Sequence, residues 1–327
     1  MSAIRGVLVA MLAFGLGLMG DTGPAAAQSY PSKTIHILVT APAGGITDTL
    51  ARALALKLTE AWGQQVIVEN RPAGAGHIAM DFVAKSTPDG YTLVVTPDSS
   101  FVVNPHLYSK LSYDPIKDFI PVSGLGVSPQ AVLVHPGVPA NTFAELVELG
   151  KKKPGELNYG TFGIGTSGHL NIVLLENLTG AKFTPVHYRG AAPAIVDLLG
   201  GHIQMMTVAI GLIQQNWQAG KVKVLGFGSS ARLPQYPDVP TVAESLPDFA
   251  AGSWYGLAAP KGTPREIVDK LSAETQKIFN DPAFRDKYLA PAVTFSIASS
   301  PEKFSERINA ELAKWGKVIK QANIKVE

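Results

Sequence analysis

The sequence predicts an α/β protein with two lobes, two segments that cross between them, and a ligand cleft between the lobes. Short apolar runs alternate with amphipathic helical runs over most of the chain. The first apolar runs begin about thirty and then about twenty-five residues apart, which is typical of right-handed βαβ units in a parallel sheet. Two extended stretches rich in Pro and Gly, residues 119–136 and 234–259, interrupt this alternation. Each stretch is interpreted as a crossing between lobes.

The first 27 residues have the pattern of a secretory signal peptide. Arg5 supplies a positive charge, residues 7–19 are apolar, and small residues precede Gln28. An uncleaved membrane anchor is the alternative, but the apolar run is shorter than the roughly 20 residues that a membrane-spanning helix needs. We therefore expect cleavage after Ala27 and a periplasmic mature chain.

The mature chain, residues 28–327, is long enough for two lobes with their own cores. Removal of Arg5 and Asp21 lowers Lys+Arg from 28 to 27 and Asp+Glu from 26 to 25, so the net charge remains +2. That balance gives no indication of nucleic-acid binding. The chain contains no cysteine, which excludes disulfides, thiol chemistry and cysteine metal ligands.

Residues 34–60 contain the first candidate binding element. An apolar strand at 35–39 leads into a small-residue loop at 41–45, and Ile46, Leu50, Leu54 and Leu58 then recur at helical spacing. Thr47 and Asp48 are placed where a helix begins and are expected to cap it. A glycine loop before a helix N-terminus collects backbone donors and positive dipole charge, so this point should attract a small anion.

The first lobe continues with a strand at 65–69, a short helix at 77–85 and a strand at 91–96. Ile78, Phe82 and Val83 are expected on the buried face of that helix. Asp98 and Ser99 follow the third strand, so they should lie on the same carboxyl edge of the sheet as the Gly44-Gly45 loop. Open α/β sheets bind their ligands at that edge.

The second series of strands and helices lies between the crossings. The first crossing follows a surface loop at 104–121, and it appears as an extended run interrupted by Gly124, Gly126 and Pro129. We expect a signal peptide at 1–27, a discontinuous first lobe at 28–128 and 229–327, and a second lobe at 129–228. The expected later strands are 131–134, 157–162, 184–188, 203–208, 222–227 and 293–297. The expected later helices are 143–152, 167–178, 191–199, 212–218 and 301–321, together with one helix that begins at Pro264 and a short one after Pro282. The last helix should pack on the first lobe through its apolar face.

The second lobe repeats the strand, glycine loop and helix of the first. Gly163, Gly165 and Gly168 form G-x-G-x-x-G between a strand and a helix, which is also the pattern of a dinucleotide-binding enzyme. That reading requires a carboxylate at the end of the next strand for the ribose, and this strand ends in His187-Tyr188-Arg189 without one. A helix N-terminus facing the cleft from each lobe favours a ligand with two polar ends.

The sequence lacks the usual catalytic arrangements. Ser167 and His169 are two residues apart on a helix, so they point to different faces, and no G-x-S-x-G elbow surrounds Ser167. The histidines show no metal-ligand spacing. His169 is expected either to contact the ligand or to form a local hydrogen bond, and Asp48 to cap and brace its loop. We therefore expect no enzyme activity, no cofactor and no metal.

Short motifs follow one another in a fixed order along the mature chain. They are Pro-x-Gly-Gly-x-x-Asp at 42–48, Glu-Asn-Arg-Pro at 69–72, Asp-Gly-Tyr-Thr-Leu at 89–93, Gly-Thr-Ser-x-His-Leu at 165–170 and Trp-Tyr-Gly-Leu at 254–257. In this order the motifs resemble those of the substrate-binding proteins of tripartite tricarboxylate transporters, the TctC or Bug (Bordetella uptake gene) family. The resemblance extends from Tyr30 to Lys317.

This resemblance implies a periplasmic binding protein of the type II architecture, acting as a monomer. Such a protein hands a small carboxylate to a membrane permease with a large and a small subunit. In the family, backbone N–H groups, hydroxyls and ordered water grip the carboxylate. The resemblance implies the site residues Ala43, Gly44, Gly45, Asp48, Asp98, Ser99, Gly165, Thr166, Ser167 and His169, and Arg189 is a further candidate.

Departures from the family pattern bear on the ligand. Ala43 and Gly168 replace prolines that are common in the family. The strand at 205–209 lacks the acidic residue that many members carry near the ligand, so we expect an acid without an amine, a di- or tricarboxylate or an aromatic acid. A binding protein that signals occupancy to a membrane sensor is the alternative function.

Overall fold

The computed structural model describes residues 30–72, 76–229, 231–247, 249 and 251–324. The expected signal peptide and its cleavage after Ala27 lie outside these residues. Residues 33 onward form one unit, and the following paragraphs concern this unit.

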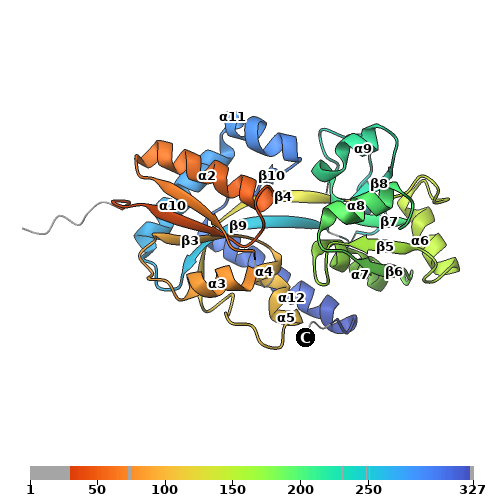
Figure 1. The fold of residues 1–327 in the computed structure, drawn as a ribbon, viewed down its shortest axis with the longest axis horizontal. Helices are drawn as coiled ribbons and strands as arrows, with labels where there is room; N and C mark the ends of the chain where they lie inside the picture. The colour runs from red at the N-terminus through yellow and green to blue at the C-terminus, as the bar shows by residue number, and fades with distance from the viewer. Residues whose placement is uncertain (1–29, 73–75, 230, 248, 250, 325–327) are drawn as a thin grey trace, which may run out of the picture. The chain divides into compact units, whose positions relative to one another are not determined.

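The described strands form one mixed sheet that is shared by two α/β series (Figure 1). The strand order is β2-β1-β3-β9-β4-β7-β5-β6, and β8 and β10 also pair with β4. The strands are β1 (Ile35–Val39), β2 (Val66–Asn70), β3 (Thr92–Pro97), β4 (Phe119–Val134), β5 (Asn158–Thr161), β6 (Thr184–His187), β7 (Met205–Ala209), β8 (Lys223–Phe227), β9 (Gly252–Pro260) and β10 (Phe295–Ser296).

The first series contains the parallel strands β2, β1 and β3. Helix α2 (Ile46–Trp62) packs on these strands through Leu50, Leu54 and Leu58, as the sequence predicts. The helices of this series are α2, α3 (His77–Ala84), α4 (Ser99–Val102), α5 (Asn104–Leu107), α10 (Arg265–Asn280), α11 (Pro282–Phe284) and α12 (Pro301–Gln321), with the turns η4 (Arg285–Leu289) and η5 (Ala290–Ala292).

The second series is built around β4, β7, β5 and β6, and its helices cover both faces of the sheet. Residues of β4 alternate between the faces: Val132 packs in one core with Leu174 of α7, and Leu133 packs in another with Leu198 of α8. The helices are α6 (Phe143–Lys152), α7 (Ser167–Thr179), α8 (Ala191–Leu199) and α9 (Gln214–Gln218), with the turn η2 (Ile210–Leu212). The turn η3 (Val242–Glu244) lies in the returning crossing segment and contacts β8.

Strand β4 belongs to both series, since it pairs with β9 through residues 119–129 and with β7 and β8 through residues 130–134. The segment after β8 returns to β9, and its Gly228 and Ala251 bond to Gln130 of β4. In Figure 1, β4 and β9 run between the two groups of helices. Two α/β halves connected by two crossing segments confirm the expected fold class, and the exact lobe boundaries stay a prediction.

The structure corrects three details. Ile78 and Phe82 are 54% and 46% exposed, so their expected burial is wrong, whereas Val83 is buried as expected, together with Ala79 and Met80. The segment at 104–121 is not simply a surface loop, because it contains α5 and buries Tyr113. Strand β4 is continuous through the expected interruptions, since Gly124, Gly126 and Pro129 all pair with β9. The register of this pairing shifts between Gly124 and Gly126, and also between Pro121 and Ser123.

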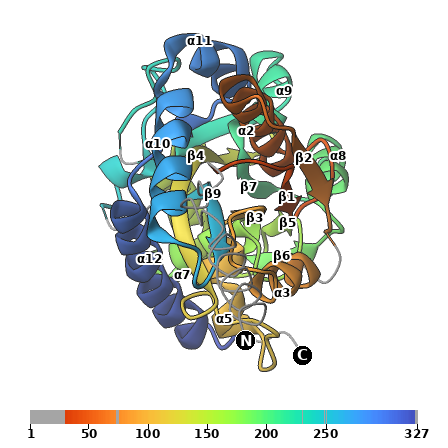
Figure 2. The same ribbon diagram turned by 90° about the vertical axis from the view of Figure 1, so that its left-hand side faces the viewer.

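Helix α12 packs through Phe304, Ile308, Trp315 and Ile319, as expected. It contacts β4, α4 and α5, and in both views it lies beside α5 (Figures 1 and 2). It also contacts α7 of the second series, so its packing is not limited to the first.

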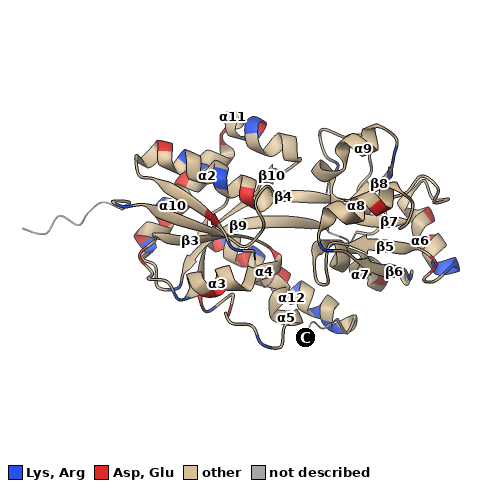
Figure 3. Ribbon diagram, in the orientation of Figure 1, with Lys and Arg blue, Asp and Glu red and all other residues tan. Residues whose placement is uncertain are grey.

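Acidic and basic residues are interspersed along the helices, whereas β4, β5, β7 and β9 carry neither (Figure 3). Charged side chains therefore reach these inner strands from other elements, as Glu311 of α12 does when its carboxylate accepts from Trp254 Nε1 at 2.8 Å. In the part of the chain that the structure describes, no helix has the length and apolar character to cross a membrane.

Candidate ligand-binding loops

The loop between β1 and α2 is held by the carboxylate of Asp48. Gly44 has a positive φ of 83°, and its N–H donates to Asp48 Oδ2 at 2.9 Å. Arg52 Nε lies 2.9 Å from Oδ1, and Asn70 Nδ2 donates to the same oxygen at 2.9 Å. Burial alone would raise the pKa of Asp48, but the hydrogen bonds from Arg52, Gly44 and Asn70 hold it below its usual value. Asp48 is buried and is a brace.

The first turn of α2 has no side-chain cap. Gly45 is the N-cap residue, so the expected capping by Thr47 and Asp48 is wrong. Asp48, the third residue after the cap, instead bonds backward to the N–H of Gly44. None of the described residues accepts the N–H groups of Ile46 and Thr47. These two donors stand at the positive end of the helix dipole.

The loop between β5 and α7 has the same design. Gly165 has a φ of 77°, and its N–H donates to His169 Nδ1 at 3.1 Å. Thr166 is an extended N-cap residue like Gly45, and its hydroxyl donates to Gly163 O at 2.7 Å instead of capping the helix. Within the described chain, no group accepts the N–H groups of Ser167 and Gly168. Both loops thus present a helix start with open donors.

His169 serves as the brace of the second loop, as Asp48 does in the first. It is 7% exposed and its ring lies 5.2 Å from that of His187. Burial, with a smaller effect of His187, lowers the pKa of His169 to about 4. A neutral ring that accepts at Nδ1 carries its hydrogen on Nε2. Of the two expected roles, the structure shows the local hydrogen bond.

Asp98 and Ser99 lie at the same sheet edge as the first loop, as predicted. Thr40 after β1 and Thr96 of β3 bond through their hydroxyls at 2.8 Å, which joins the two strand ends. Asp98 accepts from Ser99 N at 2.8 Å and from Ser253 Oγ at 3.1 Å. Burial, and to a lesser extent Glu311, raises the pKa of Asp98 to about 7. Ser99 is half-buried.

Close backbone approaches connect the loops of the second series to the first series. A Cβ on Gly165 would meet Leu107 of α5 at 2.0 Å, and one on Gly211 after β7 would meet Ala292 O at 2.8 Å. Gly44 and Gly45 also share a cavity of about 330 Å³ with Gly211. The first loop therefore opens toward the carboxyl edge of the second series, where β7 and β5 run in parallel.

The other predicted residues lie at the surface. Ala43, Gly44 and Gly45 are exposed. Arg189 is also exposed and follows β6, which pairs in parallel with β5. It forms no hydrogen bond or ion pair with any residue that the structure describes.

The sequence did not predict several residues that support Asp48 and Ser167. Arg52 and Asn70 hold Asp48, and Gln130 of β4 donates from Nε2 to Ser167 Oγ at 3.1 Å. Arg52 could have been found from its i,i+4 spacing to Asp48, and Asn70 from its place in the Glu-Asn-Arg-Pro motif. No local sequence pattern could have identified Gln130, because it is 37 residues from Ser167.

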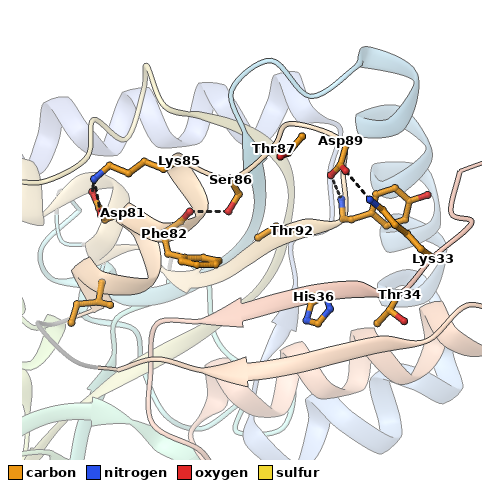
Figure 4. Close-up of a pocket in the computed structure, with 12 residues that line it drawn as sticks. Lys33, Thr34, His36, Asp81, Phe82, Lys85, Ser86, Thr87, Asp89 and Thr92 are labelled. Carbon is orange, nitrogen blue, oxygen red and sulfur yellow. Dashed lines mark hydrogen bonds and ion pairs between the residues drawn. The ribbon is translucent and has the colours of Figure 1, made fainter.

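A second cavity, of about 750 Å³, lies at the opposite edge of the first series (Figure 4). Thr34 and Thr92 line it where β1 and β3 begin. Its charged groups pair with one another, as in Lys33–Asp89 at 3.0 Å and Lys85–Asp81 at 2.7 Å. The binding edge of a parallel sheet is the carboxyl edge, so this cavity is separate from the loops above. Within the described residues, no three His, Asp or Glu side chains are grouped to hold a metal ion.

Comparison with known proteins gives one consistent result. The family model described as "Tripartite tricarboxylate transporter family receptor" matches residues 50–324. Protein BugT of Bordetella pertussis is 32% identical over 98% of both chains. The solved structure of R. palustris Rpa4515 with adipate has a TM-score of 0.81 and 32% identity, covering 91% of this chain and all of that one. MatC from Rhodopseudomonas palustris with bound malate has a TM-score of 0.76 and 31% identity, covering 89% of this chain and all of that one.

Proposed function

Because this chain belongs to the tripartite tricarboxylate transporter receptor family, we propose that it captures a small carboxylic acid in a hinged cleft and delivers it to the permease of such a transporter. The family and its solved relatives are binding proteins and not enzymes. That finding agrees with the expectation of no catalytic activity and disfavours the dinucleotide reading.

The paired loops carry the proposal. Gly45 and Thr166 begin helices whose first N–H groups are open, and Gly44 and Gly165 are fixed by Asp48 and His169 at the same relative position. Backbone N–H groups at a helix start are suited to a carboxylate. Each loop would hold one polar end of the ligand, with Ala43, Ser167 and Arg189 at the rim.

The binding free energy can be sufficient without a buried arginine. A charge-assisted hydrogen bond contributes roughly 1.5–3 kcal/mol, and a helix terminus roughly 0.3–1 kcal/mol. A micromolar ligand needs about 8 kcal/mol after the costs of association. Two anchored ends can therefore supply the required affinity.

The ligand is proposed to be an acid without an amine. The two solved relatives named above hold adipate and malate, which are both dicarboxylates. In this chain β7 reads Met-Met-Thr-Val-Ala, so it offers no carboxylate to an ammonium group. Dicarboxylates, tricarboxylates and aromatic acids are the ligand classes to test.

The proposed organisation follows the sequence expectations. The lobes comprise residues 28–128 with 229–327 and residues 129–228, and the exported monomer works in the periplasm after cleavage near Ala27. Binding of the acid closes the lobes, and the large and small permease subunits recognise the closed form.

A thermal-shift and calorimetric screen of the mature chain tests the ligand class. The panel contains adipate, malate, citrate and benzoate, with aspartate and glutamate as amine-bearing counterparts. We expect at least one amine-free acid to raise the melting temperature and to bind with micromolar or better affinity. Tighter binding of an amino acid would contradict the amine-free assignment, and a panel without any binder would contradict carboxylate capture.

Transport and sensing are separated by a second experiment. A membrane sensor reading the closed form would need the same cleft, so binding data alone favour neither role. Uptake of a radiolabelled ligand by vesicles containing the permease should require the binding protein. Unchanged uptake without it would favour the sensor.

A further inference from the structure

Gln130 is at the junction of the two crossing segments. It lies on β4 where pairing passes from β9 to β7 and is 3% exposed. Its carbonyl accepts from Gly228 N at 2.7 Å, and its N–H donates to Ala251 O at 3.4 Å. Ala251 N in turn donates to Gly228 O at 2.9 Å. The main chain of Gln130 thereby binds the outgoing crossing segment to the returning one.

The side chain of Gln130 reaches from this junction to the second ligand loop. Its Nε2 donates to Ser167 Oγ at 3.1 Å, and Ser167 is the first residue of α7. A hydroxyl that accepts from an amide N–H keeps its own hydrogen for another acceptor. Ser167 can therefore donate its hydrogen to an anion beside the open N–H groups of Ser167 and Gly168.

The surroundings indicate that Gln130 is not present for packing. Its Oε1 is buried without a partner among the described residues, and so are both amide atoms of Asn171. Asn171 is fully buried one helical turn after Ser167, so the two residues share a face of α7. An unpaired buried polar group costs stability, so an apolar residue in place of Gln130 would be expected to stabilise the ligand-free fold.

We propose that Gln130 is a positioning residue for ligand binding. It orients the Ser167 hydroxyl toward the ligand and ties that hydroxyl to both segments that cross between the lobes. The inference rests on the proposed function, because it requires a carboxylate at the second loop.

A double-mutant cycle tests this role. Gln130→Met keeps the length of the side chain but removes the donor, and Ser167→Ala removes the hydroxyl. The wild type, both single variants and the double variant are titrated by calorimetry with the acid that binds most tightly among adipate, malate, citrate and benzoate. Urea unfolding of each ligand-free protein is measured in parallel.

We expect Gln130→Met to weaken binding about tenfold, which is the loss of one oriented hydrogen bond to a charged group. The ligand-free variant should be at least as stable as the wild type. The double variant should bind no more weakly than Ser167→Ala alone, because Gln130 acts through that hydroxyl. Asn171→Leu is the matched control: it also replaces a buried amide near Ser167, and its affinity should be unchanged.

The outcomes separate the two proposals. If the wild type binds acid but Gln130→Met binds it equally well, or if the two losses add in the double variant, the role of Gln130 is refuted and carboxylate capture stands. Loss of stability together with affinity in Gln130→Met would assign Gln130 to the fold. A wild type that binds none of the four acids would overturn both proposals.

Discussion

Gly44 and Gly45 are neighbours with different conformational demands. Gly44 has a φ of 83°, whereas Gly45 has a φ of −79° and a ψ of 171°, which any residue can adopt. A Cβ on Gly45 would lie 3.6 Å from Pro42 O, an ordinary contact. We expect Gly44→Val to lower stability by about 1–2 kcal/mol and Gly45→Val to leave it nearly unchanged. Urea unfolding of the ligand-free variants measures this, and equal losses would contradict the assigned backbone.

His169 holds the second loop because its Nδ1 accepts a hydrogen bond from the Gly165 N–H, and this bond does not need a charged ring. His169→Asn keeps an acceptor near the position of Nδ1, whereas His169→Leu fills more of the space but leaves the Gly165 N–H without a partner. An unpaired buried donor costs about 1–3 kcal/mol, so the Leu variant should be the less stable at pH 7.5. Thermal melts of both variants decide this, and the reverse order would show that ring packing matters more than the hydrogen bond.

Asp98 should make stability depend on pH. Its pKa is raised from 3.8 to about 7 in the folded chain by burial. The folded state therefore binds the proton more tightly, and the stabilisation is complete below pH 3.8 and is lost as the pH rises through 7. The lost free energy is at most ~4 kcal/mol.

Asp98→Asn isolates this effect because it keeps an acceptor for Ser99 and Ser253. His169 contributes with the opposite sign: its lowered pKa removes stability as the pH falls from 6.5 toward 4, and this contribution is common to both proteins. Urea unfolding is measured at pH 4.5, 6 and 7.5. As the pH rises over this range, the free energy of unfolding should fall less in Asp98→Asn than in the wild type. Parallel curves would contradict a buried acidic Asp98.

Among the elements, α3 offers a test of exposed against buried apolar faces. Met80 and Val83 are fully buried, whereas Phe82 is half exposed and lies under the guanidinium of Arg71 at 4.3 Å. Met80→Ala should cost about 2–5 kcal/mol. Phe82→Ser should cost about 1 kcal/mol or less, the contribution of an exposed cation–π contact. Chemical unfolding measures both, and a larger loss for Phe82→Ser would restore the original prediction for this helix.

The elements also show how far the sequence could predict this fold. Helices α6, α8 and α12 begin and end where predicted, because apolar periodicity marks them locally, and side-chain caps at Thr142 and Ser300 also mark the starts of α6 and α12. Of the predicted buried residues of α3, only Val83 is buried, because apolar residues occupy both faces of this helix and periodicity alone cannot say which face meets the sheet. The bulges of β4 depend on its pairing with β9, a partner more than a hundred residues away.

The same distinction holds for the candidate site. Both glycine loops could be located from the sequence, since each follows a strand and precedes a helix. That Asp48 and His169 turn inward, and that Gln130 holds Ser167, follows from tertiary contacts that no local pattern encodes.

At the scale of the whole molecule, the two series are connected by more than the crossing segments. Helix α12 contacts both β4 and α7, and Gly165 and Gly211 pack closely against the first series. A ligand bound between the loops, as proposed, would therefore act on an interface that already exists. Closure needs the ligand to favour one arrangement of that interface over the other.

Isothermal titration of the mature chain and of its Gly45→Val variant with adipate and with malate tests whether the paired loops bind a carboxylic acid. At least one of these acids should bind to the wild type with micromolar or tighter affinity. Gly45→Val should show no detectable binding, because the added side chain would cover the open N–H groups of α2. The melting temperature of the ligand-free variant should stay nearly unchanged. Equal affinity of the two proteins would contradict the claim that the paired loops hold the acid.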